Sequence, residues 1–173
     1  MKIGIDRGHN CPPDTGASGI KSEDKVVKKL GDIITSLLEA SGHDVIDCCP
    51  GNANSINDSL SKRAAIANKA KCDLYISLHC NASNGQGHGT EVFAISDAAR
   101  VYAKPVVDAI ASLGFRNRGV KNQKFAVLRL TNMPAILIEF FFIDNKIDCD
   151  LADKLGLELT AETVVKALLS VLK

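Results

Sequence analysis

The sequence predicts an α/β domain, because short β-rich apolar runs alternate with amphipathic segments of helical spacing along the chain. The first strand is the run KIGID at 2–6. The first helix is expected from Ser22, a favourable N-cap residue, to about Ser41, before Gly42. Apolar residues recur at helical spacing between 26 and 38. We therefore expect a central, mostly parallel sheet with helices packed against it.

The remaining elements follow the same alternation. Strands are expected at 43–49, 73–82, 90–96, 124–130 and 134–142, and helices at 60–71, 97–114 and roughly 150–172. Pro105 should kink or break the helix at 97–114, because proline removes a backbone hydrogen bond. No internal repeat, low-complexity tract or linker interrupts the chain, so we expect one domain over residues 1–173.

Composition and charge narrow the classes of function. The formal net charge is +1, with acidic and basic residues interspersed, so electrostatics favour neither a nucleic acid nor an anionic membrane as partner. No apolar run approaches the roughly 20 residues that a membrane span needs. The N-terminus MKIGIDRGHN has no signal-peptide core, which predicts synthesis in the cytoplasm without an export signal. The six cysteines form no CxxC pair, and we expect reduced thiols.

Side chains with the chemistry of metal ligands or bases fall near the ends of three expected strands. His9 follows the strand at 2–6, His79 follows the run LYISL, and Glu139 ends the run AILI. In open α/β sheets, sites form beyond the carboxyl ends of strands, where the loops diverge. The three side chains would converge if their strands were neighbours with a common direction, which the sequence alone does not establish.

Glu23 is a fourth candidate, in the first turn of the first helix. It lies three and four residues before Val26 and Val27, so its side chain should point along the apolar face of the helix. A carboxylate at this end is also favoured by the helix dipole. Taken alone, Glu23 is explained more simply as a solvated first-turn glutamate.

Together, His9, Glu23 and His79 form a two-histidine, one-glutamate set. Catalytic zinc sites have three such protein ligands and keep a fourth position open for water. Glu139 would then be the base that accepts a proton from that water, and its apolar neighbours should raise its basicity.

A structural explanation of Glu139 is equally compatible with the sequence. Buried carboxylates are costly unless they are neutral, paired or bound to a metal. Glu139 could therefore form a buried ion pair with an arginine such as Arg118 or Arg129. The spacing of the residues does not decide between the metal site and the ion pair.

At these residues the sequence resembles a known family, the zinc-dependent N-acetylmuramoyl-L-alanine amidases, in the catalytic-domain type shared by bacterial autolysins and phage endolysins. The matching stretches come in the family order and span most of the chain: IGIDRGHN (3–10), TGASGIKSE (15–23), KRAAIANKAKCDLYISLHCNAS (62–83), GTEVF (89–93), NRGVK (117–121), AVLR (126–129) and MPAILIE (133–139). Each stretch alone is a weak signal, and the ordered set is specific.

The resemblance implies a central twisted sheet flanked by helices, and one Zn²⁺ ion bound by His9, Glu23 and His79. It also implies that Glu139 is the catalytic general base. The implied reaction is hydrolysis of the amide between the lactyl group of N-acetylmuramic acid and L-alanine in peptidoglycan. The expected partner is therefore a muropeptide, and the enzyme, a monomer by default, would act on the bacterial cell wall after release or lysis.

Three further residues have weaker signals. Asn81, just past His79, could orient a metal ligand or shape the turn that follows the strand. Arg118 and Lys121 could meet a carboxylate of the peptide stem, although a solvated basic loop is equally compatible with the sequence.

The chain departs from the family pattern at three places next to these motifs. Arg7 stands where proline is frequent, and Phe140 to Phe142 follow Glu139 where a glycine is common. Residues 10–13, NCPP, replace a loop that is richer in glycine. None of these changes removes a proposed ligand, but all bear on the shape of the substrate groove.

Two other functions fit parts of the pattern. One is a zinc carboxypeptidase or endopeptidase that cuts a stem peptide bond, and the other is a cell-wall-binding module without activity. The intact set of three ligands and one base argues against the binding module. No separate wall-binding domain is expected within residues 1–173.

Overall fold

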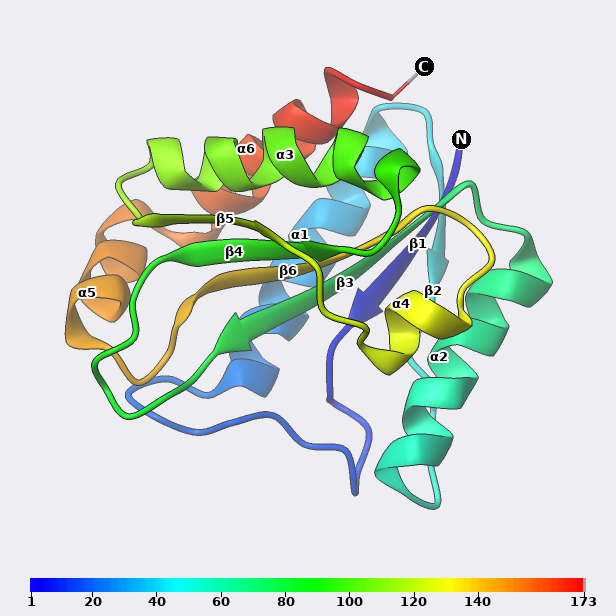
Figure 1. The fold of residues 1–173 in the computed structure, drawn as a ribbon, viewed down its shortest axis with the longest axis horizontal. Helices are drawn as coiled ribbons and strands as arrows, with labels where there is room; N and C mark the ends of the chain where they lie inside the picture. The colour runs from blue at the N-terminus through cyan, green and yellow to red at the C-terminus, as the bar shows by residue number, and fades with distance from the viewer. Residues whose placement is uncertain (173) are drawn as a thin grey trace.

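The computed structural model describes residues 1–172, and these contain one sheet of six strands (Figure 1). The strands are β1 (Lys2–Arg7), β2 (Asp44–Asp47), β3 (Leu74–Asn81), β4 (Thr90–Ala94), β5 (Asn117–Lys121) and β6 (Ala135–Phe142). Their order across the sheet is β2-β1-β3-β6-β4-β5. Every neighbouring pair is parallel except β4 and β6, which confirms the predicted mostly parallel α/β fold.

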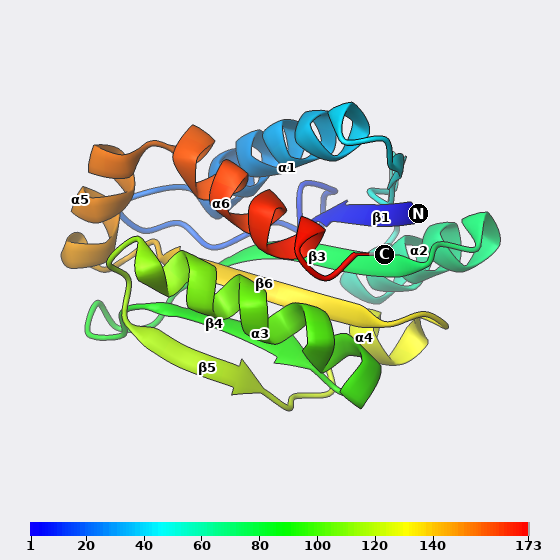
Figure 2. The same ribbon diagram turned by 90° about the horizontal axis from the view of Figure 1, so that it is seen from above.

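Helices cover both faces of this sheet. They are α1 (Glu23–Ala40), α2 (Ile56–Ala70), α3 (Asp97–Ser112), α4 (Ala126–Leu130), α5 (Lys146–Leu155) and α6 (Leu157–Leu169). The helices α1, α3, α5 and α6 contribute to one cluster of buried apolar side chains, and α2 and α4 contribute to a second. Figure 2 shows α6 lying beside both α1 and α3, which it contacts. Among the described residues, no helix is long and apolar enough to cross a membrane.

The alternation of side chains along the central strands decides which face carries each residue. In β6, Ile136 and Ile138 pack into the cluster under α1, α3 and α6, whereas Leu137 packs into the cluster under α2 and α4. In β3, Tyr75 packs into this second cluster as well. Because successive side chains of a strand point to opposite faces, the odd-numbered positions as far as 79 in β3 and 139 in β6 face α2 and α4, before the register shifts. His79 and Glu139 occupy odd positions.

The segment from 117 to 130 differs from its prediction. Residues 117–121 form the edge strand β5 instead of a loop, paired parallel with β4. Residues 126–130, expected within a strand, form the short helix α4, which contacts α2. A short apolar run has no periodicity that separates a strand from a helix. Packing of Val127 and Leu128 into the cluster under α2 favours the helix.

Three helix boundaries also differ. Helix α2 begins at Ile56, because the Ser55 hydroxyl accepts a hydrogen bond from the Asp58 N–H and caps the helix earlier than predicted. Helix α3 continues through Pro105. The predicted C-terminal helix is two helices, α5 and α6, divided at Gly156, whose φ of 78° suits glycine.

Proline is tolerated within α3 because the hydrogen bond it removes lies on the solvent side of the helix. The carbonyl of Val101 would otherwise accept that bond, and Val101 is 57% exposed. Water can therefore satisfy the carbonyl, and packing of the opposite side keeps the helix continuous.

Candidate metal and catalytic site

Strands β1, β3 and β6 lie side by side and run in the same direction, so the condition for their C-terminal ends to converge is met. His9 lies in the loop after β1, and His79 and Glu139 lie on β3 and β6. His79 and Glu139 are register partners on neighbouring strands. The sheet topology therefore places these three side chains at the C-terminal ends of three neighbouring central strands.

Helix α1 adds the fourth side chain. Glu23 is its first residue and is only 3% exposed, so the interpretation of a solvated first-turn glutamate is wrong. The Glu23 Oε2 atom accepts a hydrogen bond from the Ala17 N–H at 2.9 Å, and its Oε1 atom accepts one from the Cys80 N–H at 3.1 Å. Two backbone donors thus hold the carboxylate turned toward the sheet.

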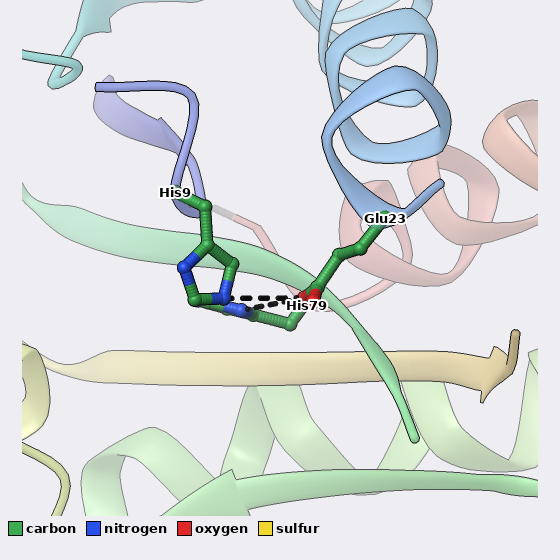
Figure 3. Close-up of side chains that lie close together, drawn as sticks. All are labelled: His9, Glu23 and His79. Carbon is green, nitrogen blue, oxygen red and sulfur yellow. Dashed lines mark hydrogen bonds and ion pairs between the residues drawn. The ribbon is translucent and has the colours of Figure 1, made fainter. Parts of the chain in front are cut away.

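His9, Glu23 and His79 come together as a cluster of metal-ligand type, with one donor atom from each residue lying within 4.8 Å of the others (Figure 3). The Glu23 Oε1 atom is 3.4 Å from His9 Nε2 and 3.0 Å from His79 Nδ1. The two imidazole rings meet edge to face, with their centroids 4.8 Å apart. Two nitrogen donors and one carboxylate oxygen therefore face a common point.

The charges of this cluster stabilise one another. Burial by itself raises the pKa of Glu23, but hydrogen bonds and charge interactions with His79 and His9 hold the pKa well below its usual range. Burial likewise lowers the pKa of His9, yet the carboxylates of Glu23 and Asp14 outweigh this effect and raise the pKa to about 9. The carboxylate thus keeps a negative charge at neutral pH, as a metal ligand must.

Glu139 lies in the cavity beside this cluster, and it forms no ion pair with any residue in the described part of the chain. Its Oε2 atom is buried and has no hydrogen-bond partner among the described residues. Burial is the main cause that raises the pKa of Glu139 to about 7. The ion-pair explanation is wrong, because Arg118 binds Glu91 at 2.8 Å and Arg129 donates to the Lys124 carbonyl.

The cavity that contains these four residues has a volume of ≈ 360 Å³. Its wall on the side of α2 and α4 is apolar and includes Ile56, Leu60 and Phe125. Asn81 and Ala82 lie on the side of β3. The site is therefore a hollow with one apolar wall, which suits a ligand that is not uniformly polar.

The three weaker candidates are distributed around Glu91. The Asn81 side-chain amide donates to Glu91 Oε1 at 2.9 Å, and Arg118 binds the other carboxylate oxygen while lying 5.0 Å above the Phe142 ring. Lys121 lies at the exposed end of β5, in a second hollow that it shares with Glu91. Of the three, Asn81 alone lines the main cavity.

Sequence reasoning missed Asp14, Ser59, Arg63 and Glu91, four buried polar residues around the site. Asp14 accepts a hydrogen bond from His9 Nδ1 at 2.8 Å. The sequence did offer one signal for Asp14, which is an acidic residue in the same loop as His9 and five positions after it. Arg63 and Ser59 gave no such signal, because they lie on a helix that is distant in sequence.

A comparison with protein-family models decides the family. The model described as N-acetylmuramoyl-L-alanine amidase matches residues 3–170. The chain belongs to this amidase family. The resemblance drawn from the sequence motifs is thereby confirmed.

Two curated relatives match most of this chain. The chain is 37% identical over 166 residues to the endolysin of Bacillus phage SPP1, covering 88% of this chain and 58% of the endolysin. It is 32% identical over 175 residues to an uncharacterized Clostridium perfringens protein. That match includes 97% of this chain but only 51% of the relative, so this chain spans about half of the relative's length.

The fold closely matches a solved endolysin catalytic domain. The catalytic domain of the CD27L endolysin, which targets Clostridia difficile, superimposes with a TM-score of 0.89 at 36% identity. The match covers 98% of this chain and 97% of that domain. The sheet and helices described above thus have the same arrangement as in that catalytic domain.

Proposed function

We propose that this chain is a zinc-dependent N-acetylmuramoyl-L-alanine amidase domain of the endolysin or autolysin type. Its reaction is hydrolysis of the amide between the lactyl group of N-acetylmuramic acid and L-alanine in peptidoglycan. The observation that carries the proposal is the gathering of His9, Glu23 and His79 in one cavity with Glu139, whose buried Oε2 atom has no hydrogen-bond partner among the described residues. Membership of the amidase family supports the bond that is cleaved.

The donor set fits a zinc ion. Two imidazole nitrogens and one carboxylate oxygen lie within 4.8 Å of one another, and zinc in catalytic sites takes this combination of ligands. His9, Glu23 and His79 would hold the ion. When bound, zinc supplies Lewis-acid chemistry, which polarises the amide carbonyl and makes water a usable nucleophile near neutral pH.

Glu139 carries the proton transfers in this proposal. Its carboxylate accepts a proton from the attacking water as the new carbon–oxygen bond forms. It then donates that proton to the nitrogen of L-alanine as the carbon–nitrogen bond breaks, so that a neutral amine leaves. In the metal-free protein, burial raises the pKa of Glu139 to about 7, which makes this carboxylate more basic than an ordinary glutamate.

The substrate extends beyond the bond that is cut. We assign Asn81 to the cavity wall beside the reacting amide, and Arg118 and Lys121 to the side where stem carboxylates would lie. The apolar wall at Ile56, Leu60 and Phe125 is available for the apolar parts of the muropeptide. On this proposal the partner is peptidoglycan and the place of action is the bacterial cell wall.

Digestion of purified peptidoglycan tests the function directly. We expect new L-alanine N-termini, no new reducing sugar ends, and loss of release on chelation, with recovery on addition of zinc. N-termini from another stem residue would move the assignment to a stem peptidase. Binding of peptidoglycan without release, with zinc present, would instead assign a wall-binding module.

A further inference from the structure

A buried arginine connects the site to the interior of the protein. Arg63, on α2, is 1% exposed and makes an ion pair with Asp6 on β1. Its guanidinium also donates to the carbonyl oxygens of Arg7 and His9, and it lies 3.3 Å from Asp14 Oδ2. A single side chain thus contacts the strand, the loop that carries His9, and the carboxylate that binds the His9 ring.

Asp14 is bound on both of its oxygens. Its Oδ1 atom accepts from His9 Nδ1 at 2.8 Å. Its Oδ2 atom accepts from the Ser59 hydroxyl at 2.7 Å and from Arg63. Ser59 in turn accepts from Arg63 Nε at 3.1 Å. The carboxylate therefore has little freedom to turn, and the imidazole that it binds is oriented with it.

The far end of the network is anchored in the sheet. Asp6 Oδ2 accepts hydrogen bonds from the Tyr75 hydroxyl at 2.6 Å and the Ser77 hydroxyl at 2.7 Å, both on β3. All three of these residues are buried. Asp6, the ion-pair partner of Arg63, is thus held by two hydroxyl groups of β3. A side chain fixed in this way can keep a loop that carries a metal ligand in place.

His9 needs this support more than the other two proposed ligands. Glu23 opens a helix and His79 lies within a strand, whereas His9 lies on the loop after β1. His9 and its neighbour Asn10 have φ values of 58° and 55°, in the left-handed region that residues with a side chain rarely adopt. The hydrogen bond from Arg63 to the His9 carbonyl holds this backbone, and Asp14 holds the ring.

We propose that Asp14 and Arg63 are positioning residues for His9, which fix its backbone and its ring so that Nε2 faces Glu23. This inference rests on the proposed function, since it takes His9 as a metal ligand. Acceptance of the Nδ1 hydrogen by Asp14 selects the tautomer with a free lone pair on Nε2 and raises the basicity of that nitrogen. Neither residue touches the metal or the substrate.

Zinc affinity is the readout that separates positioning from general stability. We would measure it for the full chain by competition with a chromophoric chelator, and record the visible absorption of the Co²⁺-substituted protein. Loss of such supporting hydrogen bonds lowers metal affinity by about 10- to 100-fold. We expect losses of this size for Asp14→Ala and for Arg63→Lys, which keeps the charge but loses the planar set of donors. The Co²⁺ spectrum should change with them.

Asp148→Asn is the matched control. Asp148 is also buried, at 2% exposure, and accepts hydrogen bonds from the Gly89 and Phe142 N–H groups, but it has no bond to the Asp14–Arg63 network. This variant should lose thermal stability and keep zinc affinity within about twofold of the parent. Ser59→Ala removes a single hydroxyl, and it serves as the network variant if Arg63→Lys does not fold.

Two outcomes separate this inference from the proposed function. If the parent binds no zinc, or if His9→Ala binds it as tightly as the parent, the metal site itself is wrong. If His9→Ala loses zinc while Asp14→Ala and the second network variant match the parent in affinity and Co²⁺ spectrum, the positioning role is wrong. Equal losses for Asp148→Asn and Asp14→Ala would also overturn it, by pointing to general destabilisation.

Discussion

Glu139 lies opposite His79 on the neighbouring parallel strand, and both side chains project to the face that α2 and α4 cover. The proposed base is thus fixed relative to a proposed ligand by the hydrogen-bonded register of two central strands. Its neighbours along β6 are apolar, and within residues 1–172 it forms no ion pair, since Arg118 binds Glu91. An unpaired carboxylate in such a place is costly for stability, which is typical of a group kept for chemistry.

Replacement of Glu139 by glutamine should abolish turnover while leaving metal bound. Loss of a general base lowers rates by about 10² to 10⁴-fold, and the amide of glutamine cannot accept the proton. The measurement is release of stem peptides from peptidoglycan, together with the zinc content of the purified variant. Normal activity of this variant would show that another group is the base.

Addition of zinc to the chelated protein should raise its thermal stability. A ligand at 100 times its Kd stabilises the folded state by about 2.7 kcal/mol when the unfolded chain does not bind it. His79→Ala should lose most of this response, because one of the three donors is missing. The measurement is the melting temperature with and without zinc. An equal rise for His79→Ala and the parent would place the bound ion elsewhere.

The metal-free protein should lose stability, relative to its Glu139→Gln variant, as pH rises from about 4.5 to about 7. The ordinary pKa of 4.5 applies to the unfolded chain, and burial raises the pKa of Glu139 to about 7 in the folded protein. A raised folded-state pKa stabilises the fold below the unfolded pKa, and this contribution is lost as pH passes the folded pKa. The loss amounts to at most about 3 kcal/mol.

Denaturant unfolding of both proteins with a chelator, between pH 4 and pH 8, tests this dependence. The free energy of unfolding of the variant, relative to that of the parent, should increase as pH rises from about 4.5 to 7, and the difference should then level off. The ionisation of His9 occurs in both proteins, so the difference reports the charge of Glu139 together with its interaction with His79 and His9. A difference that is constant with pH would mean that Glu139 ionises with an ordinary pKa.

Pro105→Ala should stabilise the protein. Proline in a helix interior is about 3 kcal/mol less favourable than alanine. Proline also restricts the unfolded chain, and this effect stabilises the folded protein by about 0.4 to 1 kcal/mol, which the alanine variant would lose. We therefore expect a gain of about 2 kcal/mol in the free energy of unfolding. Lys104→Ala, an exposed change on the same helix, should stay within about 0.5 kcal/mol of the parent. A loss of stability for Pro105→Ala would mean that the ring contributes to packing.

Much of the fold was predictable from local sequence. The alternation of apolar positions predicted β1, β3 and β6 and helix α1 with nearly correct bounds, because periodicity follows from which face of an element is buried. It failed at α4 and β5, where five-residue elements are too short to show a period. There, contacts with α2 and β4 decide the conformation.

The candidate site divides in the same way. The sequence by itself determined which side chains have the right chemistry, since His9, His79 and Glu139 follow or end apolar runs and Glu23 begins a helix. Only the tertiary structure decided that β1, β3 and β6 are parallel neighbours, that Arg118 binds Glu91 and leaves Glu139 unpaired, and that Arg63 reaches Asp14. Asp14 and Arg63 are 49 positions apart in the chain, and they meet because α2 packs across the sheet. The local spacing of apolar residues reflects which side of an element is buried, whereas pairing between charges distant in sequence depends on how the elements pack.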